Sequence, residues 1–143
     1  MMKGNILLSK VEIRNITPAT PAGYYVERKK ELNKAILAKI SNINELRQKS
    51  LGKRLHLDVC FYLNEKTGEE GDVQKDIDNL LKVISDVLPQ HFTDENNEPL
   101  EGVGLIEKKS DYMIFEINAI KKFVCTHDEE GYDIEISEFI ENS

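Results

Sequence analysis

The residues best suited to chemistry in this chain lie in one short stretch, from Lys75 to Lys82. Within it Asp76 and Asp78 are two positions apart, and Asn79 follows directly. Hard cations such as Mg²⁺ prefer oxygen ligands and are usually bound by one or two protein carboxylates, with water and phosphate oxygens in the other positions. A metal bound in that way suits hydrolysis of a phosphodiester bond. The stretch therefore predicts a divalent-metal site.

The same residues also have a purely structural interpretation. Asp and Asn are preferred helix N-caps, and acidic side chains are favoured in the first turn by the helix dipole. Apolar residues recur at helical spacing from Ile77 to Leu88, and Pro89 ends the pattern. Asp76 is thus either a metal ligand or the cap of this helix, and both interpretations stay open.

Length and composition bound the class of protein. A chain of 143 residues fits one domain with a core of its own. No apolar run approaches a membrane span or a signal peptide, so we expect a cytoplasmic protein. Cys60 and Cys125 lack the spacing of a zinc module, and two cysteines do not make a disulfide scaffold.

The net charge of −7 is unevenly distributed along the chain. Residues 1–60 hold 12 Lys/Arg and 5 Asp/Glu, whereas residues 61–122 hold 7 and 14, and residues 123–143 hold 0 and 7. The basic first part could face phosphate, and the acidic end could compete with nucleic acid for that basic surface. An ordinary solvated surface explains the same charges.

Hydrophobic periodicity predicts the order strand, helix, strand, helix, strand, strand. The last two strands are expected to form an antiparallel hairpin, and the chain after about Phe123 to add a small helix or to pack loosely. We therefore expect an α+β fold, with a small mixed sheet and helices packed on one face. The predicted elements are strands over 6–16, 55–63, 103–107 and 112–120, and helices over 27–48 and 77–88.

The run Asp76-Ile77-Asp78-Asn79-Leu80-Leu81-Lys82, with Asp86 four residues further on, resembles the signature of the RusA-type Holliday-junction resolvases. That signature reads Asp-x-Asp-Asn-x-x-Lys, with a further Asp in the same helix. The resemblance extends over residues 5–120 and is sharp over 75–86. It implies a RusA-like domain over 1–122, followed by an acidic C-terminal tail over 123–143.

The resemblance also implies an activity. Proteins of this family are homodimeric, Mg²⁺-dependent endonucleases that cut four-way DNA junctions, and Mn²⁺ is expected to substitute. Asp76 and Asp78 match the two metal-binding aspartates, and Lys82 matches the essential lysine. Asp78 and Lys82 are four residues apart on one helical side, so the ammonium could lie near the metal and the scissile phosphate. Alternatively, Lys82 is an exposed lysine paired with Asp78 or Asp86.

The family's further acidic pair has a less certain counterpart here. Asp94 and Glu95 are the preferred metal ligands after the helix, and Glu98 or Glu101 could take that role instead. A third oxygen ligand would keep the metal fixed while it polarises the phosphate. The whole acidic loop could equally be solvated surface.

Contact with DNA is expected from the basic first part of the chain. Tyr24 and Tyr25 are candidates to stack on exposed bases, or to pack in the core or a dimer interface. A non-catalytic RusA-like nucleic-acid-binding or interaction protein is the alternative to the endonuclease. The residues expected to bind phosphates are Arg28, Lys29, Lys30, Lys34, Lys53 and Arg54.

Overall fold

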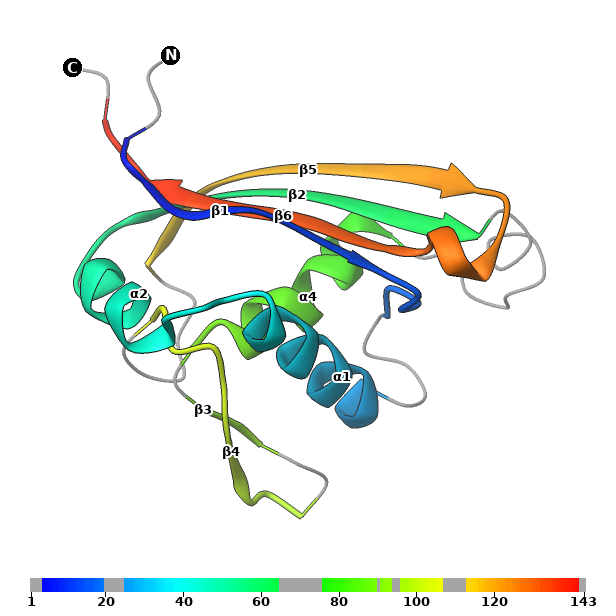
Figure 1. The fold of residues 1–143 in the computed structure, drawn as a ribbon, viewed down its shortest axis with the longest axis horizontal. Coiled ribbons are helices and arrows are strands. Elements are labelled where there is room, and N and C mark those ends of the chain that lie inside the picture. The colour runs from blue at the N-terminus through cyan, green and yellow to red at the C-terminus, as the bar shows by residue number, and fades with distance from the viewer. Residues whose placement is uncertain are drawn as a thin grey trace.

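The computed structural model describes residues 4–19, 25–64, 76–89, 91–93, 96–106 and 113–141, and Figure 1 shows their arrangement. None of the described helices is long and apolar enough to cross a bilayer. In chain order, the elements are β1 (Ile6–Arg14), α1 (Tyr25–Ala38), α2 (Ile43–Ser50), β2 (Leu55–Asn64), α4 (Ile77–Val87), β3 (His91–Thr93), β4 (Pro99–Glu101), β5 (Ile114–Val124), the 3₁₀ turn η1 (His127–Glu129) and β6 (Gly131–Glu138).

A four-stranded mixed sheet in the order β1-β6-β2-β5 forms one layer. β6 runs antiparallel to both β1 and β2, whereas β5 runs parallel to β2. The helices α1, α2 and α4 all lie on one side of this sheet, and the β3–β4 hairpin projects away from it (Figure 1). The expected α+β class, with helices on one face of a small mixed sheet, is therefore confirmed.

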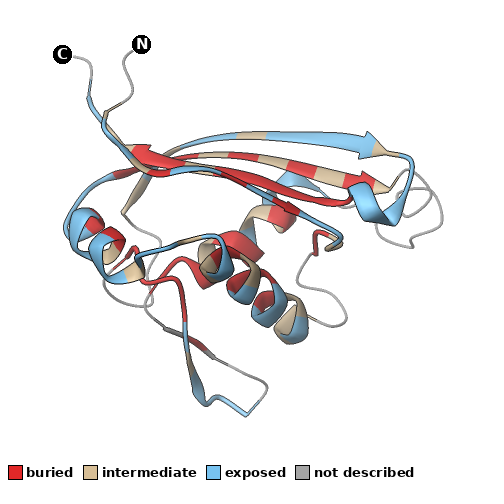
Figure 2. Ribbon diagram, viewed as in Figure 1, coloured by how far each residue is buried: buried red, intermediate tan, exposed pale blue. Residues whose placement is uncertain are grey.

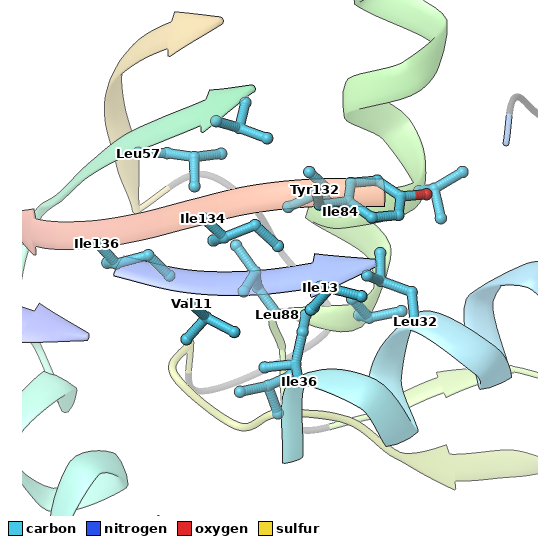
Figure 3. Packing of buried hydrophobic residues seen from close by; sticks show 14 of the residues in the cluster. Val11, Ile13, Leu32, Ile36, Leu57, Ile84, Leu88, Tyr132, Ile134 and Ile136 are labelled. Atoms are coloured by element: carbon cyan, nitrogen blue, oxygen red, sulfur yellow. The ribbon is translucent and has the colours of Figure 1, made fainter. Parts of the chain in front are cut away.

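Alternating burial explains why the sheet packs on that side only. The apolar residues of β2 from Leu55 to Leu63 are buried at every second position, as the sequence pattern requires of a half-buried strand. Figure 2 shows the buried positions gathered on the inner strands and on the sheet-facing sides of the helices. Figure 3 shows where the two layers meet, with Val11, Ile13, Leu57, Tyr132, Ile134 and Ile136 from the sheet and Leu32, Ile36, Ile84 and Leu88 from the helical side.

The single helix expected over 27–48 is two helices. Asn42 has non-helical dihedrals and its side chain accepts a hydrogen bond from the backbone N–H of Glu45 at 3.2 Å, so it begins α2 as an N-cap. Periodicity did not reveal this break because Ile36 of α1 and Leu46 of α2 both face the same core. A cap needs only one short polar side chain, which a periodic apolar pattern does not register.

The antiparallel hairpin expected from residues 103–107 and 112–120 is also wrong. β5 pairs in parallel with β2, and the described residues 103–106 form no strand beyond an isolated bridge between Ile106 and Pro89. This apolar segment instead lies buried beside the end of α4, where the N–H of Val103 donates to the carbonyl of Val87 at 2.8 Å. Alternating hydrophobicity identifies extended chain, but it does not identify the partner.

The chain after about Phe123 is expected to add a small helix or to pack loosely, and this expectation is wrong for β6. β6 lies between β1 and β2 in the middle of the sheet. Its residues Tyr132, Ile134 and Ile136 are buried with exposed fractions of 1%, 0% and 1%. Residues 131–138 thus share the sheet and the core of the first 122 residues. The acidic composition of this segment obscured its strand pattern. Its carboxylates alternate with the apolar residues and point to the opposite face of the sheet.

A polar cluster holds β1, β6 and β2 together on the sheet face opposite the helices. Asp133 of β6 lies 2.9 Å from the Arg14 guanidinium and accepts a hydrogen bond from the Tyr62 hydroxyl at 2.7 Å. The guanidinium also lies 4.2 Å from the centre of the Tyr62 ring. Burial by itself would raise the pKa of Asp133, but the hydrogen bonds from Tyr62 and Arg14 bring that pKa below its ordinary value.

A folded-state pKa below the unfolded one means that ionised Asp133 stabilises the fold above the unfolded pKa. This stabilisation is lost as the pH falls through the folded pKa. We expect Asp133→Asn to lower the free energy of unfolding by about 1.5 kcal/mol at neutral pH, the order of a hydrogen bond to a charged group. The deficit should shrink below about pH 4. Urea unfolding between neutral pH and acid measures the loss of stability and its pH dependence, with the exposed Asp128→Asn as the control. A deficit that stays constant into acid would contradict the assignment.

Candidate metal site at the start of α4

α4 presents the predicted metal ligands at its exposed N-terminal end. The buried residues of this helix are Leu80, Val83, Ile84 and Val87, which share the face toward the sheet. Asp78 and Lys82 consequently lie on the solvent side, and both are exposed, as is Asp76 just before the first turn. The amphipathic pattern that packs the helix is thus also what displays the two acids and the lysine.

Asp76 occupies the N-cap position without acting as a side-chain cap. Its backbone is extended, and its carbonyl accepts the hydrogen bond from the N–H of Leu80 at 3.0 Å, but its carboxylate makes no capping hydrogen bond. No hydrogen bond or ion pair joins the side chains of Asp76 or Asp78 to the part of the chain that the structure describes. The carboxylates are therefore not used in holding those residues together.

The alternative role considered for Lys82, an ion pair with Asp78 or Asp86, is not formed among the described residues. Asp86 interacts with α1 instead. The Tyr25 hydroxyl donates a hydrogen bond to it, and the Lys29 ammonium lies 3.8 Å from it. Burial and this hydrogen bond raise the pKa of Tyr25 above its ordinary value. Asp86 and Tyr25 thus join α1 to α4, while Lys82 points to solvent.

Lys29 is not available to DNA. Its side chain is buried, and its ammonium lies 4.4 Å from the centre of the Tyr25 ring and 5.6 Å from that of Phe92. Desolvation of a cation is offset here by two aromatic faces and the Asp86 carboxylate. The expectation that Lys29 faces phosphate is therefore wrong, and Tyr25 packs in the same interface. Tyr24 lies outside the described residues.

The other predicted phosphate ligands fall into two separate groups. Lys30 and Lys34 are exposed one turn apart on α1, close in sequence to Arg28, which pairs with Glu31 at 3.1 Å. The second group, at the start of β2, pairs with the acidic chain end. There Lys53 lies 3.8 Å from Glu138, and Arg54 lies 3.8 Å from Glu141.

Of the residues expected to complete the metal site, the structure describes Glu98 and Glu101, and it does not group either with both Asp76 and Asp78. Asp94 and Glu95 lie outside the described residues. Glu98 and Glu101 follow the far end of α4, and an 11-residue helix is about 16 Å long. Glu101 is bound by Arg47 at 2.8 Å. Among the residues that the structure describes, no three acidic, His or Cys side chains are grouped to hold a metal.

A second polar cluster on the open sheet face was not foreseen. His56 is buried, with Nδ1 2.5 Å from Glu116 and Nε2 3.0 Å from Asp58, and Asn118 donates to Asp58 at 3.2 Å. Asp58 and Asn118 of this cluster line a depression of about 260 Å³, together with Tyr62. The alternation of β2 placed His56 and Asp58 on this face, but their partners follow from the β2–β5 register, which no sequence signal indicated.

Comparison of the chain with protein-family models, with curated proteins and with solved structures gives no match.

Because the carboxylate of Asp76 makes no capping hydrogen bond, its removal should have little effect on stability. Asp76→Ala removes no capping hydrogen bond, so we expect it to lower the free energy of unfolding by less than about 0.5 kcal/mol, the helix-dipole contribution. Asn42→Ala, the matched change at the capped start of α2, should cost about 1 kcal/mol. Chemical denaturation of both variants measures the difference. Equal losses would mean that Asp76 caps α4 in solution.

Proposed function

We propose that this chain is a Mg²⁺-dependent endonuclease of the RusA type that cuts four-way or branched DNA. The observation that carries the proposal is the exposed start of α4. There the carboxylates of Asp76 and Asp78 are unused by the described part of the chain, and Lys82 follows one turn later. Two acids and a lysine kept at the surface, without ion pairs or hydrogen bonds to the described residues, are what a metal and a phosphate would need.

The chemistry of these donors fits a hard divalent cation. Asp76 and Asp78 offer carboxylate oxygens at a helix start, and Mg²⁺ is commonly bound by only one or two carboxylates. A bound metal would polarise the scissile phosphate and activate water. Lys82 would stabilise negative charge on the phosphate oxygens, and Asp94 or Glu95 would supply the third carboxylate. Mn²⁺ would support the same reaction.

DNA binding, on this proposal, uses the basic side of α1. Lys30 and Lys34 are exposed there, with Arg28 beside them, and each phosphate contact adds affinity by releasing counterions. Lys53 and Arg54 would have to leave their ion pairs with the acidic chain end before they contact phosphate. The acidic end would thus compete with DNA for them. We further propose that the enzyme acts as a homodimer in the cytoplasm.

A non-catalytic RusA-like nucleic-acid-binding or interaction protein is the second candidate. It is suggested by the acidic loop from Asp94 to Glu101, in which the counterpart of the family's acidic pair is not fixed by the sequence. This candidate keeps the scaffold and the basic surface without the hydrolysis. It predicts junction binding that needs no Mg²⁺ and yields no cut strands.

The proposal predicts loss of cleavage when the site is changed and the fold is kept. With purified protein, Mg²⁺ and a labelled four-way junction, Asp78→Asn should abolish product formation. Lys82→Ala should slow it at least about a hundredfold, because charge developing on the phosphate is no longer stabilised. Junction binding and the urea midpoint should change little, since both side chains are exposed. Asp128→Asn is the matched control at an exposed acid of η1 and should cleave normally.

The outcomes separate the candidates. Cleavage by Asp78→Asn at the rate of the unchanged protein would refute the assigned site. Binding of the junction by the unchanged protein, with no products in either Mg²⁺ or Mn²⁺, would favour the non-catalytic candidate.

Phosphate binding by α1 is tested by salt dependence. Lys34→Ala should weaken junction binding uniformly across sequences and reduce the slope of log affinity against log salt by about 1. Lys49→Ala removes an exposed lysine of α2 that pairs with Glu45 at 3.4 Å, and should leave this slope unchanged. Fluorescence anisotropy at several salt concentrations measures both. An unchanged slope in Lys34→Ala would remove α1 from the interface.

A further inference from the structure

β5 forms one edge of the four-stranded sheet. It is 11 residues long and pairs with β2 on one side, and no other described strand pairs with it. In Figure 1 its outer edge faces open space. An edge of this length presents a row of backbone N–H and C=O groups that can pair with a further strand.

The side chains of β5 are unusually apolar for an exposed strand. Figure 2 shows it largely exposed beside the buried strands β2 and β6. The described part of the chain has eight exposed large hydrophobic side chains, and four of them lie on β5. They are Phe115, Ile117, Ile120 and Phe123, exposed by 49%, 44%, 45% and 59%. Such a concentration on a free edge marks an interaction site.

These residues occur on both faces of the strand. The register with β2 places Ile117 opposite Leu57, on the helix side, and Ile120 opposite Cys60, on the open side. A partner that covered only one face would leave the other apolar side chains exposed. A partner strand that continues the sheet would cover part of both faces, because its side chains also alternate.

We propose that the partner is β5 of a second copy of this chain, paired antiparallel about Ala119. In this register Glu116 lies opposite the partner's Lys122. The partner's Phe123 lies opposite Phe115, extending the aromatic contact that Phe115 makes with Phe139 at a ring separation of 5.5 Å. The two-fold axis repeats each pair, so the interface contains two oppositely charged pairs and two aromatic pairs. Cross-strand pairs of both kinds stabilise a sheet. The sequence of β5 is therefore complementary to itself, as a two-fold interface requires.

The charges of β5 select this register. A centre one residue later, at Ile120, would place Lys122 opposite the partner's Asn118 and Glu116 opposite the partner's Val124, so both charge pairs would be lost. Lys122 is exposed and makes no ion pair with the described residues. Glu116 contacts His56 through Oε1, and its Oε2 has no partner among the described residues, which leaves it for the partner's lysine.

The resulting dimer would have one continuous eight-stranded sheet with all helices on the same side. Antiparallel pairing about an axis perpendicular to the sheet keeps each face on its own side. Lys121 would lie opposite the partner's Ile117, where its aliphatic stem can cover the isoleucine while the ammonium reaches solvent. This interface deepens the homodimer proposed above, but it is argued from β5 alone and does not depend on nuclease activity.

Sedimentation of the full chain tests the interface. We expect a species of about twice the 16.4 kDa chain mass. Ile117→Lys puts a lysine opposite the partner's Lys121 and should raise the dimer dissociation constant at least about tenfold, because like charges opposite each other destabilise a strand pair. The matched control is Ile140→Lys, since Ile140 has the same exposed fraction of 44% but lies outside β5. A monomeric unchanged protein, or equal effects of the two variants, would overturn the proposal.

Disulfide trapping tests the register without any DNA or metal. In a Cys125→Ser background, Ala119→Cys places two thiols directly opposite each other across the axis, at a Cα separation of about 4.5–5.5 Å. Ile117→Cys in the same background places them about 14 Å apart along the strands. Mild oxidation should therefore cross-link the first variant and not the second. A dimer that cross-links only through position 117, or through neither position, would overturn this pairing.

Discussion

The fold depends on the insertion of β6 between β1 and β2. This strand forms an antiparallel ladder on each side, so the first and second strands of the chain belong to one sheet only because the last strand joins them. The close approach requires a glycine at its start, since a Cβ on Gly131 would lie 1.8 Å from the carbonyl oxygen of Ile13. The long sequence separation of these ladders also means that the sheet cannot be completed until the whole chain is present.

Some Lys and Arg side chains of this protein pack against aromatic rings and carboxylates, whereas others extend into solvent. Lys29 is buried over two aromatic rings and beside a carboxylate, so it contributes to packing. Arg14 and Arg54 are exposed, but each lies over an aromatic ring and pairs with a carboxylate. Lys34 and Lys82 remain exposed on helices, without ion pairs to the described residues. A count of basic residues along the chain therefore overstates what is available to a phosphate. Burial decides which cations can bind a ligand.

The polar cluster on the open sheet face and the edge position of β5 were not predicted from sequence motifs. Parallel pairing of β2 with β5 brings Glu116 to His56 and Asn118 to Asp58, although about sixty residues separate them. The same pairing leaves β5 at the edge. A pattern within one strand determines which residues share a face, whereas the neighbouring strand determines what they meet.

The sequence by itself determined the α+β class, strands β1 and β2, helix α4 and the exposed acids at its start, because those features follow from local periodicity and composition. The break at Asn42 comes from a local side-chain cap that apolar periodicity does not register. The parallel placement of β5 and the central position of β6 were decided only by the tertiary structure. So were the burial of Lys29 and the ion pair that engages Glu101. Each depends on contacts between distant segments, and a hydrophobic pattern encodes which side of an element is buried without encoding which element covers it.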